Sequence, residues 1–223
     1  PLISVLLSVY NDEENIKKSI DSILTQSYKN IELLVIDDGS TDKTYEIISN
    51  INDSRLKIFR NKDNLGLIKC LNILIKKSKG QILARQDSDD ISLQSRLQVQ
   101  YNSLYKSQLD ACTTRGFVKN TKKAIPRFSH LLPISFVIKY KNPFIHGTLM
   151  IKKNVVLDIG MYDENIKYAQ DYKLFIDLLK KRYKIKILKN KLYVLNMENN
   201  ISSLKTEEQQ SFFKKIQKEN LWK

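Results

Sequence analysis

Gln81-Ile82-Leu83-Ala84-Arg85-Gln86-Asp87-Ser88-Asp89-Asp90 is the stretch of sequence that decides the fold. Its opening is mostly apolar and predicts a buried β-strand, and carboxylates follow that strand directly. In an open α/β sheet, ligands bind beyond the carboxyl ends of the strands. Alternate residues of an extended segment point the same way, so Asp87 and Asp89 can converge on one ligand. The stretch therefore predicts an α/β fold with a binding site at the end of this strand.

The sequence before this stretch alternates apolar strands with amphipathic helices. β-Branched runs predict strands at 2–9, 31–36 and 56–59. Apolar residues at helical spacing predict helices between and after them, at 41–51, 67–75 and 92–105. Asn11 and Glu14 have the spacing of a capping box and are expected to begin the first helix. The order β-α-β-α-β-α-β is typical of a mostly parallel sheet flanked by helices.

The sequence after this stretch is less regular. Its pattern predicts short strands near 111–118 and 148–151, a helix from about Asp171, and one or two strands within 184–195. Residues from Thr206 onward have the composition of a polar helix or a tail. We therefore expect one domain in two halves, 1–110 and 111–200, followed by a C-terminal helix or tail at 201–223.

The composition is that of a globular protein with a large positive charge. The 223 residues carry a formal net charge of +14, and basic residues concentrate at 180–191 and 119–127. Such a surface attracts nucleic acid, anionic lipid headgroups or a phosphorylated acceptor, although it also occurs as an ordinary solvated face. No apolar run approaches the roughly 20 residues that span a bilayer, so we expect a soluble, cytoplasmic protein. Cys70 and Cys112 are expected to be reduced and buried.

Carboxylates also follow the second predicted strand. Asp37 and Asp38 open the sequence Asp-Asp-Gly-Ser-Thr-Asp, which suits a turn and a helix cap at Thr41 as well as a ligand site. The first strand does not lead into the glycine-rich turn of a dinucleotide site, which argues against an oxidoreductase. Several carboxylates facing a diphosphate substrate need a cation between them, and magnesium or manganese is the natural choice.

Together these motifs resemble those of the large bacterial family of inverting glycosyltransferases (family 2-like) with the GT-A, nucleotide-diphospho-sugar transferase fold. The matching segments cover nearly the whole chain in order: Ile3-Ser4-Val5, 9–13, 35–42, 64–67, Asn72, Lys79-Gly80, 84–90 and Arg96-Leu97. The resemblance implies a Rossmann-like sheet. It also implies that 1–110 binds the nucleotide-sugar and that 111–200 binds the acceptor.

The resemblance further implies a set of donor-binding residues. They are Val9, Tyr10, Asn11, Glu13, Asp37, Asp38, Lys69, Arg85, Asp87 and Ser88. Within this set, the backbone at 9–11 and the Asp38 side chain would hold the uracil of a UDP-sugar, and Asp87 would face the ribose or the sugar. Asp89 would ligate the Mn²⁺ or Mg²⁺ ion that bridges the diphosphate.

The acceptor side contains the expected general base. In the family this residue belongs to a Glu-Asp pair before an aromatic residue, and the matching residues here are Gln170, Asp171 and Tyr172. Asp171 is therefore the expected base, with a helix cap as the alternative reading. Gln170 departs from the pattern, and an amide neighbour raises the pKa of Asp171 less than a second acid would.

Two histidines and one methionine complete the comparison with the family pattern. His146 is a candidate for lining the acceptor or donor sugar, whereas His130 is expected to be structural. Many relatives carry a histidine that approaches the diphosphate where this chain has Met197. With methionine at this position, the sequence does not predict a C-terminal contact to the metal or the diphosphate.

The sequence as a whole predicts a metal-dependent inverting glycosyltransferase. It would move a hexose or N-acetylhexosamine from a UDP-sugar to a growing surface glycan, such as capsule, lipopolysaccharide or lipooligosaccharide. The basic surface suggests a lipid-linked or glycan acceptor at the inner face of the cell membrane. One alternative is a non-catalytic sugar-nucleotide or glycan binder, prompted by Gln170 and Met197. The other, a basic nucleic-acid-binding module, leaves the strand-end carboxylates unexplained, so nucleic acid is not an expected partner.

Overall fold

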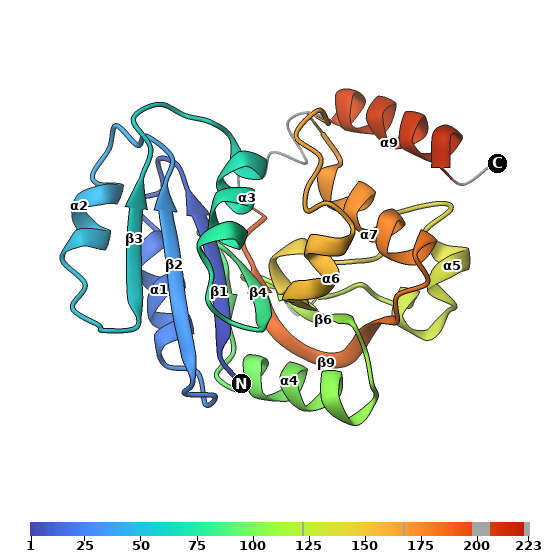
Figure 1. Cartoon of the computed structure of the whole chain (residues 1–223), viewed down its shortest axis with the longest axis horizontal. Coiled ribbons are helices and arrows are strands. Elements are labelled where there is room, and N and C mark those ends of the chain that lie inside the picture. The colour runs from blue at the N-terminus through green and yellow to red at the C-terminus, as the bar shows by residue number, and fades with distance from the viewer. Residues whose placement is uncertain (122, 167, 198–205, 221–223) are drawn as a thin grey trace.

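Four parallel strands begin the sheet in the computed structural model, which describes residues 1–121, 123–166, 168–197 and 206–220 (Figure 1). They are β1 (Ile3–Val9), β2 (Ile31–Asp37), β3 (Leu56–Arg60) and β4 (Ile82–Asp87). They lie side by side in the order β3-β2-β1-β4. All of their carboxyl ends therefore meet at one edge of the sheet.

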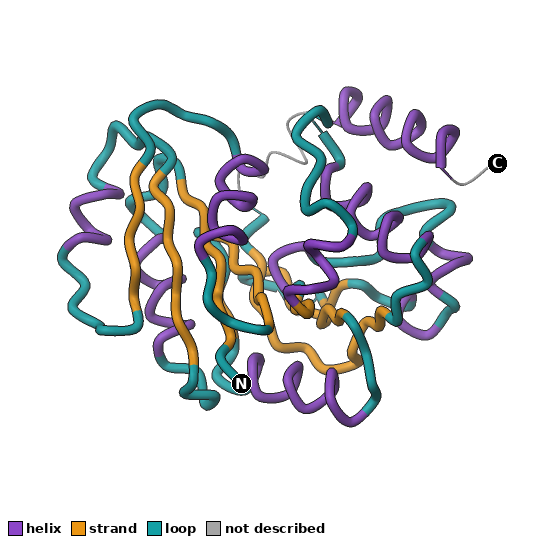
Figure 2. The backbone as a smooth tube through the Cα atoms, in the orientation of Figure 1, coloured by secondary structure: helices purple, strands orange, loops and turns teal. Residues whose placement is uncertain are grey.

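The second half of the chain extends this sheet with strands of mixed direction. β8 (Met150–Lys152) lies antiparallel between β4 and β6 (Ala111–Val118), and β9 (Ile185–Leu195) follows parallel to β6. β5 (Ile91–Ser92) pairs with β9 at the end of the order, and β7 (Ala124–Ile125) pairs with β6. Since β5 follows β4 closely in the chain but lies far from it in strand order, the sheet curls back on itself (Figure 2).

Helices cover both faces of the sheet. α1 (Ile16–Leu24), α2 (Thr44–Ser49) and α4 (Arg96–Lys106) share one apolar cluster, and α3 (Leu67–Lys77), α6 (Lys153–Asp158) and α7 (Gln170–Lys180) share the other. Successive β1 residues alternate between the two clusters, because neighbouring side chains of a strand point to opposite faces. This arrangement confirms the predicted α/β class.

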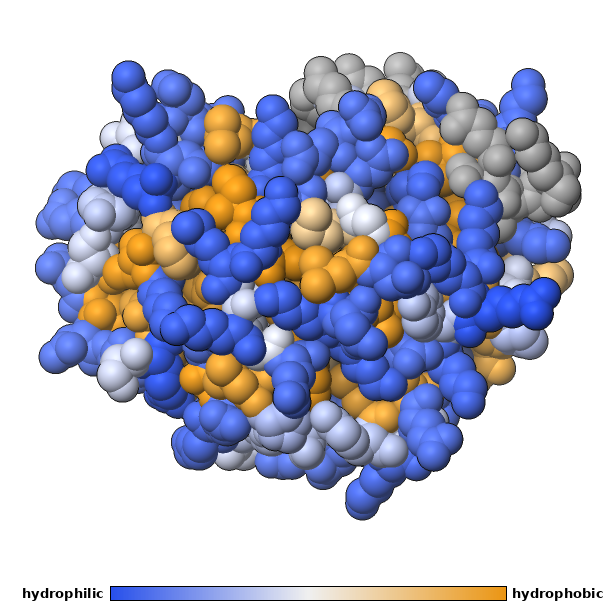
Figure 3. Space-filling model, in the orientation of Figure 1, coloured by the Kyte–Doolittle hydropathy of each residue, from blue (hydrophilic) through white to orange (hydrophobic). Residues whose placement is uncertain are grey.

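Shorter helices and one long helix complete the second part of the chain. They are η1 (Ser129–Leu131), α5 (Ile134–Val137), η2 (His146–Thr148) and α9 (Thr206–Asn220). Within the described ranges no helix is long and apolar enough to cross a bilayer. The face of the molecule in Figure 3 is mostly hydrophilic, with apolar side chains scattered over it. The sheet passes without a break from 1–110 into 111–200, so the proposed halves stay a prediction. Residues 201–205 and 221–223 of the predicted tail lie outside the described residues.

Two predicted helix starts are wrong. Asn11 does not cap α1, because it adopts a left-handed conformation (φ 49°) and its Oδ1 accepts a hydrogen bond from the backbone N of Thr41 at 2.8 Å. Thr41 does not cap α2, which begins three residues later. There the Asp42 carboxylate accepts from the backbone N of Thr44 at 2.9 Å. Both side chains predicted as caps lie instead where the loops after β1 and β2 meet.

Two element boundaries near the acidic stretch also differ from the prediction. β4 continues to Asp87 rather than ending at Ala84, because Arg85 and Gln86 are buried and stay in register with β1. The helix predicted from 92 begins at Arg96, since Ile91 and Ser92 pair with β9 as β5. Because the last residues of β4 are polar although they are buried, the hydrophobic pattern places the end of the strand too early.

A buried carboxylate links β1, β2 and β3 at the edge opposite the strand ends. Glu32 is 4% exposed and accepts hydrogen bonds from the Ser4 hydroxyl and from the backbone N of Lys79, each at 2.6 Å. It also pairs with Lys57 on β3. Burial alone would raise the pKa of Glu32, but these donors lower it below the ordinary value. Its ionised form therefore stabilises the folded protein.

We expect Glu32→Gln to lower the free energy of unfolding at pH 7 by about 1–3 kcal/mol, because the ionised acceptor is lost. The folded-state pKa is lowered, so this contribution is present above the ordinary value of 4.5 and is lost as the pH falls through the folded-state pKa. Urea unfolding at several pH values measures the gap between wild type and variant, which should shrink in acid. Glu46→Gln, exposed on α2, is the control. A gap that stays constant with pH would contradict the assignment.

Candidate active site

A large open cleft lies at the carboxyl ends of β1, β2 and β4 and extends to the start of α7. Most of the predicted site residues line it: Tyr10, Asn11, Glu13, Asp38, Lys69, Arg85, Asp87, Ser88, Asp89, His146, Gln170 and Asp171. Val9 and Asp37 are buried and do not line the cleft. The topology thus gathers residues that are up to 161 positions apart in the chain, from Tyr10 to Asp171, around one space.

Gln86 holds the acidic turn at the end of β4. Its buried side-chain amide donates hydrogen bonds to the backbone carbonyls of Asp87 and Asp90, at 3.1 and 2.9 Å, and to the Ser19 hydroxyl at 2.9 Å. Its carbonyl oxygen accepts from the Ser92 hydroxyl at 2.6 Å. The Gln86 side chain therefore fixes the backbone path of 87–92. Its hydrogen bonds cannot be predicted from the neighbouring sequence.

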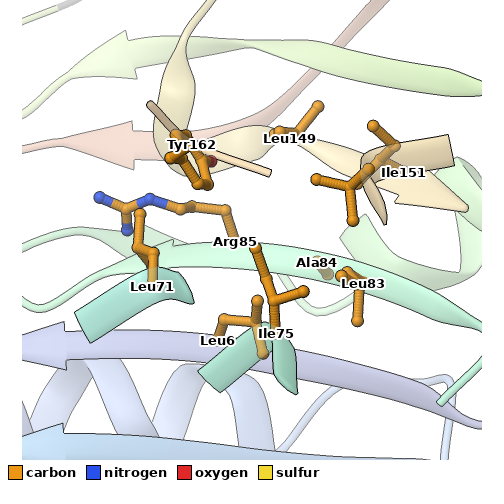
Figure 4. A pocket seen from close by; sticks show the side chains of 10 residues that line it. Leu6, Leu71, Ile75, Leu83, Ala84, Arg85, Leu149, Ile151 and Tyr162 are labelled. Atoms are coloured by element: carbon orange, nitrogen blue, oxygen red, sulfur yellow. The ribbon is translucent and has the colours of Figure 1, made fainter. Parts of the chain in front are cut away.

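Arg85 neutralises part of the negative charge of this turn. Its guanidinium Nη2 lies 2.7 Å from the Asp87 Oδ1, and the side chain is only 4% exposed. Burial alone would lower the pKa of Arg85, but the charge of Asp87 raises it. Figure 4 shows the Arg85 stem beside a small apolar pocket, with the guanidinium directed away from Leu83 and Ile151. That pocket is part of the packing behind the site.

The remaining carboxylates of the turn are crowded. Burial and the charge of Asp87 raise the pKa of Asp89 to about 6. The same two causes raise the pKa of Asp90, which accepts a hydrogen bond from the backbone N of Asn196 at 2.7 Å. Within the described part of the chain, no three acidic, histidine or cysteine side chains gather into a metal site. Mg²⁺ commonly uses one or two carboxylates together with substrate phosphates, and this donor set fits that mode.

Asp37 and Asp38 have separate structural contacts. The Asp38 carboxylate accepts from the Asn61 side chain and from the backbone N of Leu65 and Gly66, at 2.8 to 2.9 Å. Asp37 forms an ion pair with Arg60 at 3.0 Å. Asp38 lies in the cleft wall, and the nucleotide contact predicted for it stays a prediction. Its carboxylate also fixes the loop that leads into α3.

Asp171 lies in the first turn of α7, with part of its side chain open to the cleft. Its Oδ2 accepts a hydrogen bond from the Asn142 side chain at 2.7 Å. The surrounding protein raises the pKa of Asp171, and the bond from Asn142 opposes that shift. The next residue, Tyr172, donates from its hydroxyl to the carbonyl of Ile138 at 2.7 Å. Segment 138–142 therefore supports the predicted base.

His146 occupies the wall between the acidic turn and Asp171. Its Nε2 lies 2.6 Å from the Tyr162 hydroxyl, and the two rings meet edge to face. Burial, followed by the charge of Arg85, lowers the pKa of His146 well below its ordinary value. The imidazole is therefore neutral near pH 7 and can contact a neutral sugar hydroxyl.

Three residues near the site have no role predicted from the sequence: Arg96, Gly147 and Tyr193. Arg96 is fully buried and donates to the carbonyls of Gly147 and Arg85, each at 2.9 Å. Tyr193 accepts from the backbone N of Asp87 at 3.1 Å. A Cβ on Gly147 would clash with both the Asp87 carboxylate and the Tyr193 hydroxyl. Of these three residues, only Arg96 belongs to a segment that matches the family pattern.

Two residues that the sequence analysis considered lie outside the cleft lining. One of them is His130, on η1. Met197 is 45% exposed and also outside the lining, although its neighbour Asn196 is part of it. Cys70 and Cys112 are buried free thiols, which confirms the prediction for both.

Comparison with known proteins gives concordant results. The family model "Glycosyl transferase family 2" matches residues 4–163. An uncharacterized glycosyltransferase of Haemophilus influenzae is 32% identical over 99% of this chain and 73% of its own length. The Escherichia coli enzyme WfgD, named a UDP-Glc:alpha-D-GlcNAc-diphosphoundecaprenol beta-1,3-glucosyltransferase, is 31% identical over 80% of this chain and 70% of its own length.

A solved structure agrees with the sequence relatives. S. aureus TarS 1-349 in complex with UDP-GlcNAc superimposes with a TM-score of 0.80 at 21% identity, covering 96% of this chain and 65% of that chain. This likeness confirms the GT-A fold. Since the family model covers most of the chain and the H. influenzae relative extends over nearly all of it, the chain belongs to glycosyl transferase family 2 and is a glycosyltransferase.

Proposed function

We propose that the protein is a metal-dependent, inverting glycosyltransferase that moves a hexose or N-acetylhexosamine from a UDP-sugar. The observation that carries this proposal is that one cleft contains both the acidic turn after β4 and the half-buried carboxylate of Asp171. The first group suits a donor diphosphate, and the second suits an acceptor hydroxyl. The charge of Arg85 opposes the rise in the pKa of both Asp89 and Asp171.

The donor would lie over the ends of β1, β2 and β4. Tyr10, Asn11 and Asp38 would bind the nucleoside, with Glu13 and Lys69 beside it. Asp87 and Ser88 would face the ribose or the sugar, and Arg85 would keep Asp87 in place through the ion pair described above. Val9 and Asp37 would act only as support for these contacts, because they do not line the cleft.

Asp171 would act as the general base in a single displacement. Its ionised carboxylate would take the proton of the acceptor hydroxyl while that oxygen attacks the anomeric carbon opposite the leaving diphosphate. His146 and Gln170 would contact the acceptor or the donor sugar. Asp89, with help from Asp87 and the diphosphate oxygens, would hold the Mn²⁺ or Mg²⁺ ion, which supplies Lewis-acid neutralisation of the leaving group when bound.

The relatives suggest the class of acceptor. WfgD is named for transfer to a diphosphoundecaprenol-linked sugar, so a lipid-diphosphate-linked acceptor and a role in a surface glycan are reasonable for this chain. The net charge of +14 suits a phosphorylated acceptor at the cytoplasmic face of a membrane. A non-catalytic sugar-nucleotide binder is the second candidate, because Gln170 replaces an expected glutamate. UDP binding without turnover would distinguish it.

We expect Asp89→Ala to abolish metal-dependent donor hydrolysis, with a loss of about a hundredfold or more, because charge neutralisation at the leaving group is a major part of catalysis. A panel of UDP-sugars is incubated with Mn²⁺, Mg²⁺ or EDTA, and released UDP is measured. Asp21→Ala, in an exposed helix pair on α1, is the control and should behave as wild type. Full activity of Asp89→Ala in EDTA would rule out the metal role.

We expect Asp171→Asn to lose transfer to an acceptor by about a hundredfold or more while UDP-sugar binding is retained, since only the base is removed. Isothermal titration with UDP-sugar and transfer kinetics separate the two effects. NMR of the product should show an inverted anomeric centre. A product with the donor's anomeric configuration would refute the single displacement.

We expect the acid limb of kcat/KM to reflect Asp171, whose pKa is raised by burial. The base must be ionised, so activity falls as the pH drops through this pKa. Asn142→Ala removes a hydrogen bond that favours the charged form, and the limb should move to higher pH. Asn102→Ala, exposed on α4, is the control. An unchanged limb in Asn142→Ala would show that another group controls the profile.

A further inference from the structure

Segment 128–140 exposes an unusual set of apolar side chains. Phe128, Leu131, Leu132, Phe136 and Tyr140 are 59%, 71%, 50%, 55% and 64% exposed. We call these five side chains the apolar patch. Single exposed apolar residues are ordinary on a protein surface, but a group within one short segment marks an interaction surface.

The patch is the outer side of a folded segment. Phe128 and Leu131 belong to one turn, in which the backbone N of Leu131 donates to the carbonyl of Phe128 at 2.9 Å. The rings of Phe136 and Tyr140 meet at 5.2 Å across one helical turn. Between them Val137 and Ile138 are buried in the protein. The segment therefore has an apolar inner side that packs on the core and an apolar outer side that faces solvent.

The sequence around the patch is strongly basic. No aspartate or glutamate occurs from 111 to 157, whereas nine lysines and arginines do: Arg115, Lys119, Lys122, Lys123, Arg127, Lys139, Lys141, Lys152 and Lys153. Arg127 lies over the ring of Phe128. β9 contacts η1 and adds the exposed Lys186, Lys189 and Lys191. Exposed apolar side chains within a basic segment suit the interface of an anionic bilayer, where the aromatic rings enter the headgroup region and the cations meet phosphates.

The patch adjoins the acceptor side of the cleft. Asn142, two residues after Tyr140, donates to the Asp171 carboxylate, and Ile138 accepts from Tyr172. In Figure 1, α5 lies at one end of the molecule and β3 at the opposite end. A lipid-linked acceptor rising from a bilayer under the patch would reach Asp171 directly.

We propose that the apolar patch docks the protein on an anionic lipid bilayer and so delivers a lipid-linked acceptor to Asp171. Delivery of the acceptor rests on the proposed function. Binding of the patch to the bilayer needs neither donor nor acceptor. The positive charge of segment 111–157 favours an anionic membrane over a second copy of this chain, which would bring like charges together.

Flotation with lipid vesicles tests the surface. Wild type should float with vesicles of phosphatidylcholine and phosphatidylglycerol, and much less with phosphatidylcholine alone or at high salt. The double variant Leu131→Ser, Phe136→Ser should bind the anionic vesicles about tenfold more weakly or worse. The reason is that it lacks two apolar side chains that would enter the bilayer. Leu93→Ser with Leu157→Ser is the matched control, because both leucines are exposed outside the patch.

The outcomes are distinct. Circular dichroism and UDP-sugar binding should be unchanged in the patch variant, since its residues do not line the cleft. Asp171→Asn should bind vesicles as wild type does, so loss of transfer with intact docking would count against the proposed function alone. Equal flotation of patch variant and wild type, or no flotation of wild type, would overturn the docking surface. Self-association in light scattering that the patch variant abolishes, without vesicle binding, would assign the patch to a protein partner instead.

Discussion

Carboxylates crowded at the end of one strand are the constraint on which the rest of this structure depends. Asp87, Asp89 and Asp90 follow β4 within four residues, and their mutual repulsion has to be balanced by fixed partners. The protein meets this requirement with the Gln86 amide beneath the turn and the Arg85 guanidinium beside Asp87. Burying these two polar side chains in a strand is tolerated because most of their polar atoms find hydrogen-bond or ion-pair partners. Part of the cleft is therefore organised from behind, by the buried Gln86 side chain, which does not line it.

Much of the fold follows from local sequence. Apolar runs and helical spacing predict the parallel strands and the helices of the first half, because each of these elements buries one face against the sheet. The second half resists the same method. β8 has only three residues and η2 is a single turn, so neither is long enough to show a period. β9 is a strand rich in exposed lysines, and its pairing with β6 contains register shifts that no local pattern shows.

The candidate site was predictable where a family motif marks it and hidden where distant residues complete it. Asp38, Asp87 and Asp171 stand in recognisable motifs, and all three line the cleft. Arg96 and Tyr193 come from segments about a hundred residues apart, and their contacts with β4 and Gly147 exist only after folding. At Asn11 the sequence instead predicts a contact that does not form. Its sequence context suits a helix cap, but a hydrogen bond with the loop after β2 replaces that local contact.

The pairing of β5 with β9 has a consequence for the order of assembly. Ile91 pairs with Val194, the Asp90 carboxylate accepts from the backbone of Asn196, and Tyr193 accepts from the backbone of Asp87. All three contacts join the acidic turn to residues made about a hundred positions later. Because domains emerge from the ribosome N-terminus first, the parallel strands can form while the turn still lacks its partners. The nascent chain thus gains its catalytic competence late, when the last strand of the sheet has been synthesised.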